Sequence, residues 1–242
     1  MSSPVPEHAY KKVKMDFGPS TAVMIYVGKG ATKKIFVAHE PFLTNRSEFF
    51  RNALSTAPVD SKTQEVKLPE GRPDIFSLYL HHVYTGRLGT IRTELDNHPC
   101  ASMQLYMQAL AEEYKDIFDF YMLGVRLGDV TARGGAMLAL INKMRFHSKQ
   151  KSMYPGAAYL PMVYEGTQIG SPCRLILIDS LCCLPPDLLE KGLKKSVDAI
   201  PKEALVDLAV AFSKKPVDPI VVNPSRYAEA ICIDVKEEPA TK

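Results

Sequence analysis

Three short segments near the start of the chain have the residue content of β-strands. Residues 22–27 (AVMIYV) and 35–38 (IFVA) are rich in β-branched and aromatic side chains, and the turn residues of 28–32 separate them. This order predicts a β-hairpin. Residues 64–68 (QEVKL) alternate polar and apolar side chains like a half-buried strand, and the Pro- and Gly-containing residues 69–73 then predict a turn.

Helical spacing of apolar residues begins at His39. The pattern over residues 39–55 predicts two short helices, with Asn45 or Ser47 placed to cap the second. A longer helix is predicted over Asp74–Tyr84. It carries apolar residues on two sides, so we expect it to be buried between neighbouring elements.

Beyond a polar segment at 87–102, which we interpret as an exposed loop, the pattern is helical and no strand pattern appears. The apolar run from Cys173 to Leu184 is interrupted by Arg174 and Asp179, which predicts a core helix and not a membrane span. The predicted helices are two over 105–127, then 130–146, 160–165, 173–184, 188–200 and 202–213.

Composition narrows the class of protein. The 30 Lys and Arg residues nearly balance the 27 Asp and Glu residues, leaving a net charge of +3, so direct nucleic-acid binding is not expected. The first 20 residues contain no apolar stretch of the length that a signal sequence or membrane span requires. The five cysteines show neither a regular framework nor paired zinc-ligand spacing. We therefore expect an intracellular protein, cytoplasmic, nuclear or both, with reduced thiols and no membrane contact.

Five short sequences in this order resemble the BTB/POZ domain. They are Met24–Gly28, Ile35–His39, Ser47–Arg51, Val66–Leu68 and Tyr84–Gly86. His39 stands where strand gives way to helix, and a glycine after Tyr84 permits a left-handed helix end.

The resemblance predicts an α+β fold, in which a BTB/POZ domain with a three-stranded sheet and helical hairpins precedes an all-α C-terminal extension. The expected division is a flexible leader at 1–19, the BTB/POZ domain at 20–130, the helical extension at 131–215 and a flexible tail at 216–242. Within the extension, Val163–Thr167 and the sequence that follows it are similar to fungal BTB proteins.

The family resemblance implies homodimers, substrate adaptors for cullin ubiquitin ligases, or transcriptional regulators that carry a separate DNA-binding domain. Cullin-binding members often have an apolar residue, any residue and then Glu after the second short helix. The matching positions here are Pro58, Val59 and Asp60, which depart from that pattern but remain the candidate cullin contact. No internal repeat or Cys/His array follows the domain, so target recognition would use the helical extension.

The short motifs that could indicate a catalytic, phosphate-binding or metal-binding site are incomplete. Gly28–Gly30 lacks the spacing of a phosphate-binding loop, and His39–Glu40 lacks the second histidine of a zinc protease because Leu43 follows at the required position. His81 and His82 point about 100 degrees apart on a helix and cannot chelate jointly. We expect no catalytic, cofactor-binding or metal-binding residues, and no enzymatic activity.

Two surface features bear on regulation. Lys236, in Val235–Glu238, fits the short pattern accepted by SUMO-conjugating enzymes and is the candidate SUMO acceptor. The basic runs Lys11–Lys14 and His147–Lys151 fit either a nuclear address, a contact for an acidic partner, or a plain solvated surface.

The sequence therefore predicts a protein-interaction module, a dimerising adaptor or scaffold that could serve as substrate adaptor for a cullin-type ubiquitin ligase. The alternative is a nuclear transcriptional or chromatin co-regulator that acts through protein contacts. The expected structural core comprises Phe49, Phe50 and Leu54, with Tyr79 and Tyr84 packing on the next helix.

Overall fold

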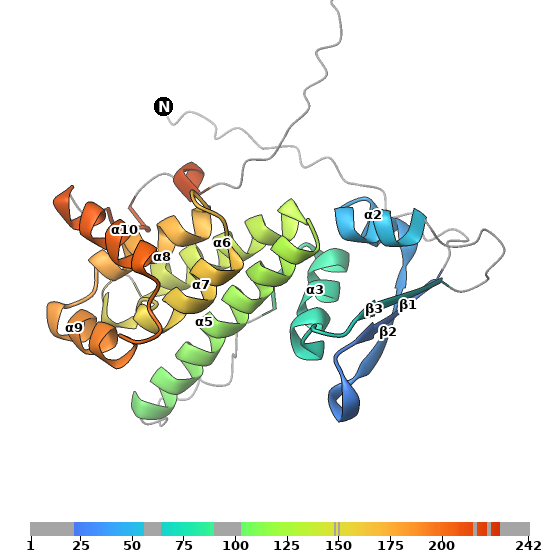
Figure 1. Ribbon diagram of the computed structural model, residues 1–242, viewed down its shortest axis with the longest axis horizontal. Coiled ribbons are helices and arrows are strands. Elements are labelled where there is room, and N and C mark those ends of the chain that lie inside the picture. Colours follow the sequence, from blue (N-terminus) through green and yellow to red (C-terminus); the bar gives the residue numbers. More distant parts are fainter. Residues whose placement is uncertain are drawn as a thin grey trace, which may run out of the picture.

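The computed structural model shows a small sheet at one end of an elongated molecule and a stack of helices at the other (Figure 1). It describes residues 22–55, 64–89, 103–147, 149, 151–214, 217–221 and 224–227.

The sheet has three strands in the order β2-β1-β3. β1 (Ala22–Val27) pairs antiparallel with β2 (Lys34–His39) and parallel with β3 (Gln64–Leu68). Alternate residues of β1, Val23, Ile25 and Val27, are fully buried because one face of the sheet packs on the helices. The hairpin and the third strand are confirmed.

Two short helices follow β2. They are α1 (Glu40–Thr44) and α2 (Glu48–Ser55). Ser47 caps α2, since its Oγ accepts a hydrogen bond from the Phe50 N–H at 3.2 Å, whereas Asn45 lies at the C-terminal end of α1.

The third helix, α3 (Pro73–Thr85), begins at a proline and ends at a left-handed residue. Gly86 has φ 70°, a conformation that favours glycine. Apolar residues on two sides of α3 are buried, as predicted, because the helix packs between α1, α5 and α6.

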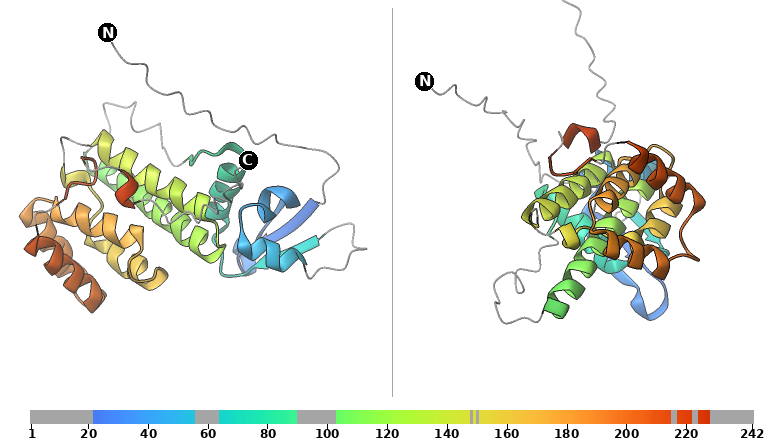
Figure 2. Two further views of the ribbon diagram at one scale, coloured as in Figure 1. Left: turned by 90° about the horizontal axis from the view of Figure 1, so that it is seen from above. Right: turned by 90° about the vertical axis from the view of Figure 1, so that its left-hand side faces the viewer.

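The prediction of two helices over 105–127 is wrong. α5 (Met103–Arg126) is one continuous helix of 24 residues. Its sequence has no proline, and its single glycine, Gly124, lies in the last turn, so nothing interrupts the backbone hydrogen bonds. α6 (Val130–Phe146) then returns antiparallel beside α5, as the views in Figure 2 show.

The C-terminal part contains α7 (Leu160–Gly166), α8 (Pro172–Cys182), α9 (Pro186–Lys195) and α10 (Lys202–Ser213), with a short 3-10 helix η4 (Pro224–Tyr227). α8 is a core helix, as predicted. α9 was predicted to reach residue 200 but ends at Lys195, ahead of the turns that lead to Pro201.

One hydrophobic core runs through both parts of the molecule. α5 contacts α3, α6 and α7, so it joins the sheet-containing part to the helical part. The predicted domain boundary near residue 130 falls at the turn between α5 and α6 and stays a prediction. No helix in the described ranges combines the length and apolar character that crossing a membrane requires.

Candidate partner-binding site

A buried polar junction fixes the helices of the N-terminal part. Asp129, fully buried at the start of α6, accepts hydrogen bonds from Arg46 Nε at 3.1 Å, the Tyr79 hydroxyl at 3.0 Å and the Ala132 N–H at 2.8 Å. Burial, and then the nearby Asp129 carboxylate, raises the pKa of Tyr79, which therefore stays a neutral donor. The junction ties the α1–α2 turn and α3 to α6, and its bonds are internal. It is a support and not a binding site.

The residues predicted from the sequence to form the core lie at different depths. Phe50, Leu54 and Tyr79 are buried, whereas Phe49 and Tyr84 are half-buried. Phe49 packs edge-to-face on Phe50, with ring centroids 5.3 Å apart. The Tyr84 hydroxyl accepts a hydrogen bond from the His39 N–H at 3.0 Å, which joins the end of α3 to the end of β2.

The candidate cullin contact, Pro58, Val59 and Asp60, and the candidate SUMO acceptor Lys236 lie outside the described residues. The cullin contact and the SUMO acceptor therefore both stay predictions.

The residues of the incomplete phosphate-loop and zinc-protease motifs have structural roles. Gly28 and Gly30 have positive φ in the β1–β2 turn, and Lys29 between them pairs with Glu70. The Nδ1 atom of His39 lies 2.9 Å from the Tyr84 hydroxyl. Within the described ranges, no three His, Cys, Asp or Glu side chains are grouped closely enough to hold a metal ion.

His81 and His82 face different environments. His81 is exposed, whereas His82 is buried edge-on against Phe120, with ring centroids 5.5 Å apart. Burial, and then the charge of Arg46, lowers the pKa of His82, so the imidazole is neutral near pH 7. It borders a hollow of about 450 Å³ between α3 and α6, whose rim carries the exposed Leu138 and Phe146.

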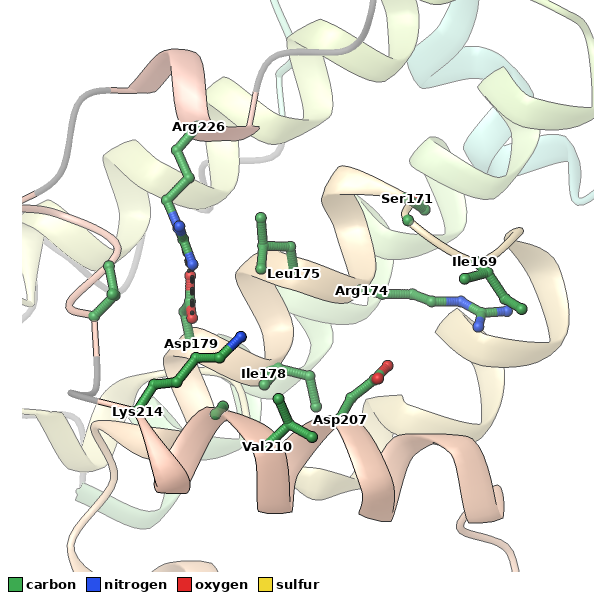
Figure 3. Close-up of a pocket in the computed structure, with 13 residues that line it drawn as sticks. Ile169, Ser171, Arg174, Leu175, Ile178, Asp179, Asp207, Val210, Lys214 and Arg226 are labelled. Carbon is green, nitrogen blue, oxygen red and sulfur yellow. Dashed lines mark hydrogen bonds and ion pairs between the residues drawn. The ribbon is translucent and has the colours of Figure 1, made fainter.

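The groove between α8 and α10 has the clearest combination of open apolar surface and fixed polar ends (Figure 3). We call it the α8–α10 groove; its volume is about 440 Å³. Leu175 and Ile178 of α8 line one side, and Val210 and Ala211 of α10 line the other. This arrangement leaves apolar surface accessible to a side chain from outside, as binding sites for peptides do.

One end of the groove is held by Arg174, a buried residue of α8. Its guanidinium donates to the Tyr164 carbonyl at 2.8 Å, to Thr167 Oγ1 at 3.0 Å and to Glu203 Oε2 at 3.0 Å. The same group stacks on the Tyr164 ring, 4.3 Å from the ring centroid. Arg174 thereby fixes the α7–α8 turn against the start of α10, and this end of the groove is preorganised.

Asp207 lies at the same end. It accepts a hydrogen bond from the Tyr164 hydroxyl at 2.6 Å. Burial, and then this bond to the carboxylate, raises the pKa of Tyr164, so the phenol remains a donor.

The opposite end carries a surplus of positive charge. Asp179 accepts from the Tyr227 hydroxyl at 2.8 Å and from Arg226 Nε at 3.0 Å, which holds η4 against α8. The hydrogen bond to Asp179 raises the pKa of Arg226. Lys214 adds a second cation and forms no ion pair with a described residue.

Sequence reasoning did not identify this groove. Asp207, Val210 and Ala211 of α10 have i, i+3, i+4 spacing, which places them on one face, and Lys214 follows as the residue that caps the helix end. That spacing could have indicated a second functional face, but the partner wall comes from α8, and the pairing of the two helices is a tertiary property.

Comparison with known families identifies the N-terminal part of the molecule. Residues 17–119 match the BTB/POZ domain, a non-catalytic protein-interaction module, and no curated protein matches the chain. This part of the chain is therefore a BTB/POZ domain, and the family prediction is confirmed. BTB domains commonly dimerise and bind partner proteins. The similarity of the extension to fungal BTB proteins stays a prediction.

Proposed function

We propose that this protein is a dimerising adaptor or scaffold, in which the BTB/POZ domain provides assembly and the helical extension provides recognition of a partner. The observation that carries the proposal is the α8–α10 groove. It lies beyond the residues that match the BTB/POZ domain, and Arg174 and Asp179 fix its two ends while its apolar sides stay open.

The BTB part offers apolar surface for self-association. Ile35 and Val37 of β2 are 56% and 64% exposed on the sheet face that the helices leave uncovered. On the α1–α2 pair, Phe42 and Phe49 are half-buried and contribute less apolar surface. Both surfaces belong to one end of the molecule (Figure 1), so a two-fold interface there would leave the α8–α10 grooves of both subunits accessible.

A cullin is the specific partner class to test. The chain is examined by size-exclusion chromatography with light scattering, alone and mixed with the N-terminal region of a cullin from the same organism. A dimer that gains the cullin mass supports a ubiquitin-ligase adaptor, and Val59→Asp should then reduce binding. A dimer that ignores the cullin supports a scaffold for other partners, and a chain that stays monomeric and binds no cullin contradicts the proposal.

The alternative, a nuclear co-regulator, has weaker support. In the basic run that follows α6, His147 is buried and Lys151 pairs with Asp218. Both residues are therefore engaged within the molecule, and less charge remains for a nuclear address or an acidic partner. Exclusion of a fluorescently tagged chain from nuclei would remove this alternative.

A further inference from the structure

The described chain leaves the helical extension at the rim of the α8–α10 groove. Arg226 borders the groove, and the next residue, Tyr227, is held by its hydrogen bond to Asp179. In Figure 3 the Arg226 side chain reaches down from η4 toward Asp179, above Lys214 and Val210. The 15 residues that follow Tyr227 are thus tethered beside an open apolar surface.

We propose that residues Ile231–Val235 of the same chain bind in the α8–α10 groove, as an internal occupant that a partner must displace. The displacement of the tail by a partner rests on the proposed function, whereas the binding of the tail to the groove does not.

The tether is short enough to enforce proximity. Cys232, the middle of Ile231–Ile233, is five residues beyond Tyr227, and five residues span at most about 17 Å. Such a short tether gives an effective concentration in the millimolar range. A contact too weak to form between separate molecules is therefore sufficient to fill the groove within one chain.

The tail has the chemistry that the groove requires. In an extended segment Ile231, Ile233 and Val235 share one face, which matches the apolar sides of the groove. Asp234 lies between Ile233 and Val235 and places a carboxylate on the opposite face of such a segment, and the groove entrance carries the cations Lys214 and Arg226. An apolar segment with an adjacent negative charge is complementary to an apolar groove with a positive entrance.

Cross-linking in the full-length chain tests the proposal. Val210→Cys places a thiol in the groove, and Phe212→Cys places one on α10 but outside the groove. The two positions are matched, because the native side chains are 45% and 47% exposed and lie two residues apart. Each variant is treated with a short bismaleimide, and linkage to the native Cys232 is quantified by peptide mass spectrometry. We expect several-fold more intramolecular linkage from Val210→Cys.

The other thiols near the groove give little background. Burial raises the pKa of both Cys182 and Cys183 to about 11, so few of these thiols are ionised near neutral pH. Cys173 is fully buried in α8.

A second variant distinguishes binding of the tail in the groove from its mere proximity to the groove. Ile231→Asp with Ile233→Asp keeps the tether and Cys232 but removes the apolar face. In the Val210→Cys background it should lower the linkage to the level of Phe212→Cys. Equal linkage from Val210→Cys and Phe212→Cys, or linkage unchanged by the aspartates, would overturn the proposal.

Predominantly intermolecular products that increase with protein concentration would also overturn it, because the tail of a second copy would then occupy the groove. Cross-linking of the pure chain requires neither a partner nor dimerisation. A failure of this proposal is therefore distinguishable from a failure of the adaptor function.

Discussion

Replacing Asp129 by alanine should be among the most damaging single changes in the described part of the chain. The carboxylate is fully buried and accepts three hydrogen bonds, from Arg46, Tyr79 and the Ala132 N–H. Alanine leaves a partly buried guanidinium and a buried hydroxyl without this acceptor, and it also removes the N-terminal cap of α6.

The expected decrease in the free energy of unfolding follows from the broken ion pair and the lost helix cap. Breaking a buried ion pair by removing one partner costs about 3 to 5 kcal/mol. Arg46 retains weak hydrogen bonds to the His82 and Val83 carbonyls at 3.3 and 3.4 Å, and its side chain is 17% exposed. Since the guanidinium is partly compensated, we expect the lower part of that range, about 3 kcal/mol. The cap accounts for about 1 kcal/mol of the total.

Chemical denaturation of the full-length chain measures the change in the free energy of unfolding. Asp129→Ser keeps a capping oxygen, so it should recover about 1 kcal/mol relative to alanine. Asp74→Ala is the matched surface control, because Asp74 pairs with Arg72 but its side chain is 59% exposed, and it should cost less than about 1 kcal/mol. If Asp129→Ala and Asp74→Ala cost the same, the assignment of Asp129 as the central support is wrong.

Three further predictions test other parts of the structure. Gly134→Ala should stabilise α6 by about 0.5 to 1 kcal/mol. Gly135→Ala should not stabilise it, because the added Cβ would lie 2.7 Å from His82 Cε1. Thermal unfolding of the two variants measures the difference. His82 has a lowered pKa, so folding loses stability as the pH falls below about 6.5, and His82→Gln should reduce that loss in denaturation measured across this pH range. Cys182 and Cys183, with pKa values of about 11, should be alkylated about 100-fold more slowly at neutral pH than an unperturbed thiol, and mass spectrometry over time would contradict this if they reacted first.

The strands and most helices could be predicted because local sequence determines them. Strand β3 follows an alternating pattern, and the left-handed end of α3 needs the glycine at 86. The continuity of α5 was missed because an apolar pattern does not show whether two stretches of helix are joined. The absence of proline, and of glycine before the last turn, is the sequence feature that favours a single helix.

The α8–α10 groove could not be predicted from the sequence for a different reason. Its walls come from α8 and α10, and its ends depend on contacts of Arg174 with Glu203 and of Asp179 with Tyr227, which are far apart in sequence. In the sequence, Arg174 and Asp179 are only charges that interrupt an apolar run. Their role as buried anchors follows from tertiary packing, which no periodicity encodes.

The decisive experiment is a measurement of whether the pure chain self-associates through its BTB/POZ domain. Light scattering is measured on the full-length protein over a wide range of concentration, and the mass is compared with the 26.9 kDa of one chain. We predict a mass close to twice that value, and a lower mass for the variant Val37→Asp on the uncovered face of the sheet. A mass that stays at 26.9 kDa at every concentration would contradict the claim that the BTB/POZ domain assembles this protein.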